Sequence, residues 1–153
     1  MKIITLDEIT FDKYTKTHKY RNYYQTSAYG KVMKNNNCNI HYIGIIDDNN
    51  NLLGASLILY KEVFMNYKIA YAPRGILFDY TNLENLTEFT TRLKRLLSKQ
   101  GFMFLKIDPL IPANLRNKDG KIININKEAN IILENLKANN YDYLGPNLFF
   151  EAE

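Results

Sequence analysis

The segment Tyr71-Ala72-Pro73-Arg74-Gly75 combines residue types that can display a charged side chain at the end of a strand. Pro73 fixes φ and lacks an N–H donor, so the strand before it is expected to end there. Gly75 permits a sharp turn or a close backbone approach. Arg74 would then be displayed where its guanidinium can bind a carboxylate or a phosphate through two parallel hydrogen bonds. The alternative is a surface arginine in a loop between a strand and a helix.

Asp108 places a carboxylate in a similar position. It follows an apolar predicted strand over residues 102–107 and precedes Pro109. Such a carboxylate can accept hydrogen bonds from a ligand, or it can cap a loop by accepting them from backbone N–H groups. The sequence alone favours neither interpretation over the other.

A third candidate is a helix N-terminus with lysines close to it. The segment QTSAYGK, residues 25–31, contains two residues that favour the N-cap position, Thr26 and Ser27, and it is followed by a further basic residue. Lys31 and Lys34 would lie on this helix. Because the first N–H groups of a helix bind anions, the pattern predicts a second place that suits a negatively charged ligand.

The other residue types that often carry chemistry lack partners in this sequence. Walker, G-x-G-x-x-G, H-E-x-x-H and G-x-S-x-G patterns are absent. His18 stands among basic residues and is expected on the surface, whereas His41 alternates within a strand and is expected to be structural. A single cysteine, Cys38, excludes an internal disulfide and a cysteine-rich zinc site and favours a reduced, cytoplasmic setting. No metal site is expected.

The first half of the chain should supply the elements that position these residues. In chain order, the expected elements are helices over 6–17 and 26–34 and antiparallel strands over 39–46, 52–64 and 67–72. Thr5 is the expected N-cap of the first helix, and either Thr26 or Ser27 that of the second. Gly54 is expected to mark a β-bulge or a close approach of two segments.

The second half is expected to hold a helix over 83–99, a strand over 102–107, a helix from 126 or 127 to 139, and the start of a final strand at 148–150. Thr81 is the expected N-cap of the first of these helices, and Gly101 its stop. Two prolines and an Asp119-Gly120 turn predict a loop over 110–121. The predicted order is α-α-β-β-β-α-β-α-β.

Composition limits the class of protein. The chain has 153 residues, of which 46% are hydrophobic and 24% charged, and these values suit one globular domain and exclude a mostly disordered chain. No apolar run approaches about 18 residues, so no membrane span is expected. The N-terminus turns acidic early, so no secretory signal is expected. The net charge of +4 mildly favours anionic partners but falls short of a nucleic-acid-binding signature.

These motifs occur in the same order in a known family, and the sequence resembles the FemABX peptidoglycan-bridge aminoacyltransferases, which include methicillin-resistance factors. The resemblance covers residues 20–150. The matching features are QTSAYG at 25–30 (family pattern Q-[ST]-x-x-[WY]-[AG]), the strand pair around 47–48 and 53–55, YAPRG at 71–75 (Y-x-P-[RK]-G), and LKIDP at 105–109, a strand that ends in D-P.

The resemblance implies a fold and an activity. The fold would be α/β (α+β), a GNAT-like acyl-CoA N-acyltransferase fold with a central, mostly antiparallel mixed sheet flanked by helices. Residues 1–153 would form a single domain that corresponds to the first of the family's two GNAT-like halves, with the second half absent. Family members transfer an amino acid from aminoacyl-tRNA to an amine on the stem peptide of a lipid-linked or UDP-linked precursor, in cell-wall biogenesis that maintains cell shape.

The resemblance also implies where the partners bind. The precursor would be bound by Asp108, Arg74, Lys31, Lys34 and Tyr71, while the catalytic residues stay unassigned because the acyl-transfer machinery belongs to the missing half. Aminoacyl-tRNA would be a co-substrate that is contacted through that half, with no other cofactor, in the cytoplasm or at the inner face of the membrane. The sequence departs from the family pattern at Met33, close to where relatives have a lysine, and at Ile76, where they have proline.

Three other interpretations stay open. The isolated chain could be a non-catalytic module that only binds the precursor. It could be a stand-alone GNAT N-acyltransferase, but the [RQ]-x-x-G-x-[GA] turn that grips acetyl-CoA in such enzymes is absent. It could bind nucleic acid through the basic residues of the helix over 83–99, although charges there also suit the solvated face and C-terminal end of a helix.

Overall fold

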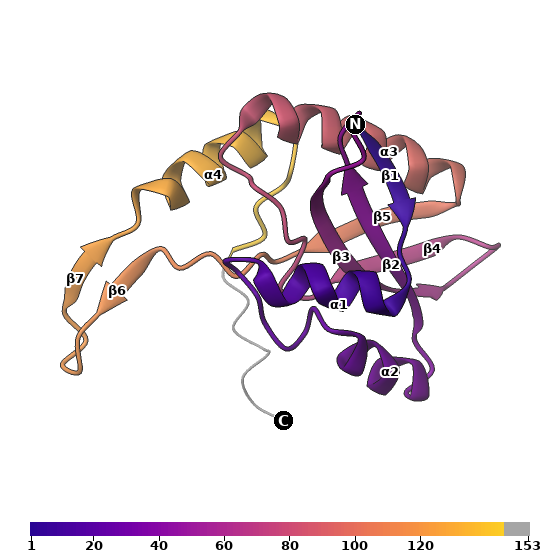
Figure 1. The fold of residues 1–153 in the computed structure, drawn as a ribbon, viewed down its shortest axis with the longest axis horizontal. Coiled ribbons are helices and arrows are strands. Elements are labelled where there is room, and N and C mark those ends of the chain that lie inside the picture. Colours follow the sequence, from indigo (N-terminus) through magenta and orange to yellow (C-terminus); the bar gives the residue numbers. More distant parts are fainter. Residues whose placement is uncertain (146–153) are drawn as a thin grey trace.

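A computed structural model describes residues 1–145, so the strand predicted at 148–150 lies outside the described residues. Its centre is a five-stranded sheet in the order β1-β2-β3-β4-β5 (Figure 1). These strands are β1 (Lys2–Thr5), β2 (Asn39–Ile46), β3 (Leu52–Glu62), β4 (Lys68–Ala72) and β5 (Phe102–Ile107). Neighbours are antiparallel from β1 to β4, whereas β4 and β5 run parallel.

Helices cover both faces of this sheet, as Figure 1 shows. Helices α1 (Glu8–Thr17) and α2 (Ser27–Asn35) lie on one face, and α3 (Leu83–Lys99) and α4 (Lys127–Ala138) lie on the other side. Alternate residues of a strand point to opposite faces, so β2 supplies both cores. Ile43 and Ile45 pack with Phe89 of α3, whereas Tyr42 packs with Phe11 of α1.

The predicted meander of three antiparallel strands is confirmed, and Gly54 shows both features expected of it. The register between β2 and β3 shifts near this glycine, because Ile45 pairs with Gly54 but Ile46 pairs with Leu52. A Cβ atom on Gly54 would lie 2.8 Å from the Phe78 ring and 2.9 Å from the backbone oxygen of Leu77. The bulge and the close approach therefore occur together.

Two helices begin at caps other than those predicted. Asp7, and not Thr5, caps α1, since its carboxylate accepts a hydrogen bond from the Thr10 N–H at 2.8 Å while Thr5 belongs to β1. Asn82, and not Thr81, caps α3. A carboxylate or amide oxygen at either position satisfies the exposed N–H groups of the first turn. For α2 the cap is Thr26, one of the two predicted residues.

The prediction missed β1 and a second, two-stranded sheet. Strand β1 pairs along the outer edge of β2, where it is too short and too exposed to show a clear alternation. The segment predicted as a loop over 110–121 contains β6 (Asn114–Arg116), which pairs with β7 (Ile122–Ile125) across the predicted Asp119-Gly120 turn. This hairpin extends away from the main sheet (Figure 1).

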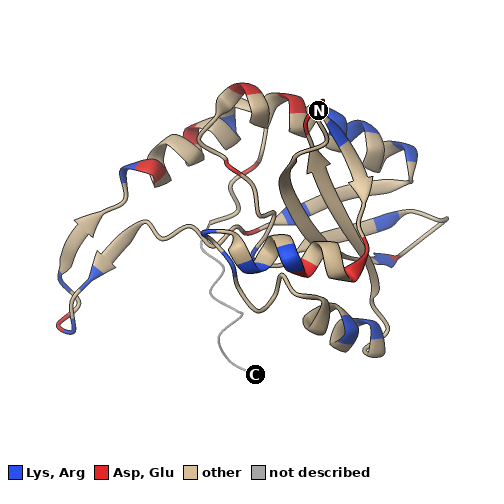
Figure 2. Ribbon diagram, in the orientation of Figure 1, with Lys and Arg blue, Asp and Glu red and all other residues tan. Residues whose placement is uncertain are grey.

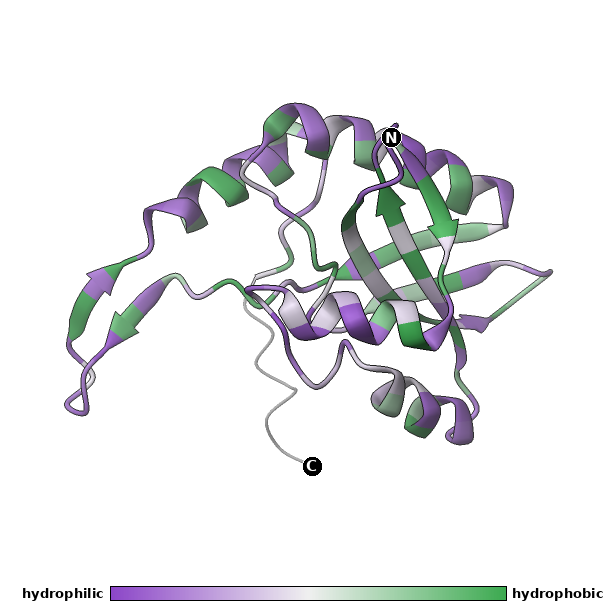
Figure 3. Cartoon of the chain, in the orientation of Figure 1, coloured by the Kyte–Doolittle hydropathy of each residue, from purple (hydrophilic) through white to green (hydrophobic). Residues whose placement is uncertain are grey.

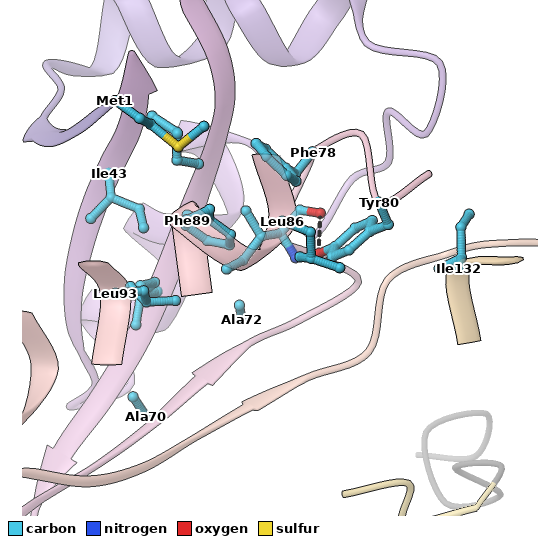
Figure 4. Close-up of a cluster of buried hydrophobic side chains, with 13 residues drawn as sticks. Met1, Ile43, Ala70, Ala72, Phe78, Tyr80, Leu86, Phe89, Leu93 and Ile132 are labelled. Carbon is cyan, nitrogen blue, oxygen red and sulfur yellow. Dashed lines mark hydrogen bonds between the residues drawn. The ribbon is translucent and has the colours of Figure 1, made fainter. Parts of the chain in front are cut away.

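Tyr80 closes the core beneath the loop that follows β4. Its side chain is 1% exposed and packs with Ile76, Phe78 and Leu86 (Figure 4). The hydroxyl donates to the Ile76 carbonyl at 2.8 Å and accepts from the Ile76 N–H at 3.1 Å. A buried side chain thus satisfies both polar groups of one loop residue.

Replacing Gly54 with alanine is expected to lower the free energy of unfolding by about 1–3 kcal/mol, because the added methyl group meets a ring and a backbone oxygen that cannot both move cheaply. Urea unfolding followed by circular dichroism measures the change. Glu62→Ala, at an exposed position on the same strand, serves as the control and should change the value by less than about 0.5 kcal/mol. Equal effects of the two substitutions would contradict the packing argument.

Stability is expected to fall as the pH rises from about 10 to about 12. Burial raises the pKa of Tyr14 and of Tyr42 to about 12, and it raises the pKa of Tyr80 as well. The folded chain therefore retains protons that the unfolded chain loses near about pH 10. Urea unfolding at about pH 9 and about pH 11 measures the decline, and Tyr42→Phe should reduce it. Ionisation of every tyrosine near the ordinary pKa in the folded protein would refute this expectation.

Candidate functional site

The parallel strands β4 and β5 end side by side and bring two predicted residues together. Tyr71 pairs with Lys106 and Ala72 with Ile107, after which both strands stop. Pro73 ends β4 as the sequence predicts. Arg74 and Asp108 follow the two strands, at the carboxyl edge where sheets with parallel strands commonly bind ligands.

The Asp108 carboxylate joins the two strand ends. Its Oδ2 accepts a hydrogen bond from the Tyr71 hydroxyl at 2.8 Å, and its Oδ1 accepts one from the Arg74 backbone N–H at 2.5 Å. Partial burial, and then this bond to Asp108, raises the pKa of Tyr71 far above its usual range, so the hydroxyl stays protonated and donates. The loop-capping role that the sequence left open is therefore present. An ionised carboxylate has about four acceptor sites, so the two bonds leave acceptor capacity for a ligand.

Arg74 occupies the left-handed region, with φ of 50°. A non-glycine residue in that conformation costs about 1–2 kcal/mol, and surrounding hydrogen bonds offset part of this cost. The Arg74 carbonyl accepts a bond from the Asn22 amide at 3.0 Å, and its N–H is bound by Asp108. Both polar groups of its backbone are thus fixed, and its side chain is half-buried.

Gln25 secures the same loop from the opposite side. Its side chain is 0% exposed, and its amide nitrogen donates to the Pro73 carbonyl at 2.8 Å and to the Leu57 carbonyl at 3.3 Å. Its amide oxygen accepts from the Leu57 N–H at 2.8 Å. A Cβ atom on Gly75 would come within 2.7 Å of this amide, so only glycine fits there without a shift. The sequence placed Gln25 in a motif but did not reveal this role, and it gave no sign of Asn22.

Three tyrosine rings at the N-terminal end of α2 form a group. The rings of Tyr23, Tyr24 and Tyr29 contact one another edge to face, with centroids 5.1–6.0 Å apart. Burial raises the pKa of Tyr29, with smaller contributions from Tyr24, Cys38, Tyr23 and, last, Asp108. On the strand side, the Lys106 ammonium lies 5.5 Å from the centre of the Tyr71 ring. The candidate site, with these tyrosines and the residues at the ends of β4 and β5, therefore combines aromatic rings with the charges of Arg74, Lys106 and Asp108.

The helix N-terminus that was predicted to bind an anion is occupied by a carboxylate of the same chain. Asp12 accepts a 2.9 Å bond from the Ser27 N–H and a 2.6 Å bond from the Ser27 hydroxyl. Lys31 points toward α1, where its ammonium pairs with Glu8 at 2.7 Å, and Lys34 is exposed in the last turn of α2. The structure thus groups Tyr71, Arg74 and Asp108 but records no contact of either lysine with them.

The remaining residues singled out in the sequence lie outside this cluster. Burial lowers the pKa of both His18 and His41, and His41 bonds Thr5 at 3.1 Å as a structural residue would. Cys38 is a half-buried free thiol. Within residues 1–145, no group of His, Cys, Asp and Glu side chains has the arrangement of a metal site, and no helix is long and apolar enough to cross a membrane. The cluster is therefore suited to binding an anionic or zwitterionic molecule through Arg74 and Asp108.

Comparison with known proteins gives consistent matches. The sequence model of the FemAB family matches residues 6–153. The chain is 30% identical over 122 residues to "Aminoacyltransferase FemA" of Staphylococcus aureus strains MW2 and COL, a match that covers 80% of this chain and 29% of the relative. A structure described as "Crystal structure of FemX" is 22% identical with a TM-score of 0.67, and the match covers 90% of this chain and 31% of that one.

Two facts follow from these comparisons. The mixed α+β fold with a mostly antiparallel sheet flanked by helices is confirmed, and the structural match to FemX fits the predicted GNAT-like fold. The chain spans about a third or less of the length of the proteins that it matches, 29% of FemA and 31% of FemX.

Gln25→Ala is expected to lower the free energy of unfolding by about 2–4 kcal/mol, because it leaves the buried Leu57 N–H and Pro73 carbonyl without partners. Urea unfolding measures this loss. Gln100→Ala, at the other glutamine, which is exposed, is the matched control and should cost less than about 0.5 kcal/mol. If the two variants were equally stable, the bonds of Gln25 would not be what holds the loop.

Proposed function

The chain belongs to the FemAB family, and from that premise we propose that it is the first part of an aminoacyltransferase that acts in cell-wall bridge formation. The complete protein transfers an amino acid from aminoacyl-tRNA to the stem peptide of a peptidoglycan precursor. This part binds the precursor, which is lipid-linked or UDP-linked. Arg74 beside Asp108 at the ends of β4 and β5 is the observation that supports this role most directly.

The chemistry of the precursor suits the charges of this cluster. Its phosphates and stem-peptide carboxylates are anionic, and the Arg74 guanidinium can bind either through two parallel hydrogen bonds. A carboxylate can orient the stem peptide or its acceptor amine, and Asp108 retains acceptor capacity after its bonds to Tyr71 and Arg74. Lys31 and Lys34 contribute only a diffuse positive potential under this proposal, because Lys31 already pairs with Glu8.

The acyl transfer itself needs little besides positioning. An amine attacks the ester of aminoacyl-tRNA, the C–N bond forms, the C–O bond to the tRNA breaks, and the amine proton leaves on a base or on the departing oxygen. Alignment of the two reactants supplies much of the rate of such a step. We assign its catalytic groups and the aminoacyl-tRNA contacts to the part of the relatives that lies outside the match, and we expect no further cofactor. The setting is the cytoplasm or the inner face of the membrane, where bridge formation supports cell shape and, in relatives, methicillin resistance.

A non-catalytic role for the isolated chain is the second candidate. It is favoured because the match covers only 29% of FemA. A transfer assay with the 153-residue chain, a muropeptide and aminoacyl-tRNA distinguishes the two: a precursor-binding module binds the muropeptide but forms no product, whereas a complete enzyme does both. A thermal shift on addition of acetyl-CoA would instead favour a stand-alone N-acyltransferase.

Arg74→Ala and Asp108→Ala are each expected to weaken binding of UDP-N-acetylmuramyl pentapeptide by about tenfold or more, because each removes a charge-assisted contact. Isothermal titration calorimetry measures the affinity. Arg116→Ala, on the β6–β7 hairpin, is the control and should bind as the unaltered chain does. Since Asp108 also caps the loop, circular dichroism must show that the variant is folded. Unchanged affinity in both variants would remove these residues from the binding site.

A further inference from the structure

The turn between β3 and β4 exposes an apolar tip that no other described segment covers. Four large side chains form this tip: Val63, Phe64, Met65 and Tyr67, which are 52%, 68%, 75% and 51% exposed. The turn is well formed, since the Val63 N–H donates to the Tyr67 carbonyl at 2.9 Å and the Tyr67 N–H donates to the Phe64 carbonyl at 2.8 Å. It extends beyond the helices at the edge of the molecule (Figures 1 and 3).

Two further exposed apolar side chains lie near the start of β5, next to this tip. Met103 and Phe104 are 62% and 55% exposed. The Lys68 N–H donates to the Gly101 carbonyl at 2.9 Å, and this bond joins the start of β4 to the start of β5. The six apolar side chains therefore belong to one end of the sheet. Met103 and Phe104 are consecutive in β5 and point to opposite faces of the strand, so exposed apolar side chains occur on both faces at this end. Exposed apolar side chains gathered in one region often mark a binding surface.

Lysines flank the tip and indicate the charge of its partner. Lys61 and Lys99 are exposed, and Lys68 is half-buried with its ammonium 5.6 Å from the centre of the Phe102 ring. Glu62 is the acidic residue among them. Figure 2 shows further basic residues along the C-terminal part of α3, next to this end of the sheet. A lysine stem can lie along apolar surface while its charged end reaches a phosphate.

We propose that this tip inserts into the headgroup region of an anionic phospholipid bilayer, with Lys61, Lys68 and Lys99 contacting lipid phosphates. The proposal goes beyond the function given above, since it needs no precursor in the membrane. Aromatic and aliphatic side chains with adjacent lysines are the combination that binds such an interface. The tip is a convex turn rather than a groove, which suits a fluid lipid surface better than it suits a folded partner.

The β6–β7 hairpin shows why the position of the apolar residues matters. It also exposes apolar side chains, such as Leu115 at 59% and Ile123 at 60%. Its turn, however, is the polar and charged segment Asn117-Lys118-Asp119-Gly120. The β6–β7 turn cannot enter a bilayer without burying charged side chains. The turn between β3 and β4 can enter it, because its outermost residues carry no charge.

Strand β4 links the tip to the candidate site. The tip precedes the start of β4 at Lys68, and Arg74 follows its end at Ala72. A strand rises about 3.3 Å per residue, so the candidate site lies roughly 20 Å from the lipid-contacting turn. A substrate anchored in the same membrane could reach the site at that height.

Co-sedimentation of the 153-residue chain with vesicles tests the proposal. The vesicles contain phosphatidylglycerol and phosphatidylcholine, or phosphatidylcholine alone. We expect binding to the anionic vesicles that weakens as salt is added. Phe64→Ser with Met65→Asn should weaken binding about tenfold or more through lost apolar contact. Lys61→Gln and Lys99→Gln should each weaken it about fivefold on the anionic vesicles only.

The matched control is Leu115→Ser with Ile123→Ser, which removes two exposed apolar side chains from the other hairpin and should leave binding within about twofold. Absence of binding to anionic vesicles, or an equal loss in the control, would overturn the proposal. Sedimentation equilibrium without lipid reports the competing explanation: self-association that disappears in the Phe64→Ser, Met65→Asn variant would make the tip a protein interface. Muropeptide calorimetry is independent of these outcomes, so failure here leaves the proposed function to its own test.

Discussion

The buried amide of Gln25 is the interaction on which the candidate site depends. It joins the segment before α2, the middle of β3 and the loop after β4, three parts of the chain that lie 32 and 48 residues apart in sequence. An amide with no exposed surface must form all of its bonds or destabilise the fold. Because the geometry that satisfies Gln25 also fixes Pro73, the loop bearing Arg74 is set by the folding of the core.

The loop after β4 is held almost entirely by side chains from elsewhere. Gln25 binds the Pro73 carbonyl, Asn22 and Asp108 bind the two polar groups of Arg74, and Tyr80 binds both groups of Ile76. Leu77 then pairs with Ala55 of β3. A segment with so many fixed groups loses little entropy when a ligand binds to it, which is the condition for strong and specific recognition.

The sequence predicts the parts of this fold that repeat a pattern. The period of two in β2 and β3 and the helical spacing in α3 identify those elements, and Pro73 identifies the end of β4. It does not predict β1 or β6, because these strands are too short to show an alternating pattern. It also cannot choose between neighbouring N-cap residues such as Asn82 and Thr81. For the site, the sequence identifies Arg74 and Asp108 as candidate ligand-binding residues at the ends of two strands. That Asp12 occupies the α2 terminus depends on two helices meeting in space, and no local pattern records it.

Position 74 separates the shape of the loop from what the loop recognises. The bonds from Asn22 and to Asp108 that fix this residue use its backbone carbonyl and N–H and not its guanidinium. A relative could therefore exchange this side chain for another without rebuilding the scaffold. Substrate preference at this position can then change with the side chain, within the residue types that tolerate a φ of 50°, and a protein engineer who wished to redirect the site would begin with this single residue.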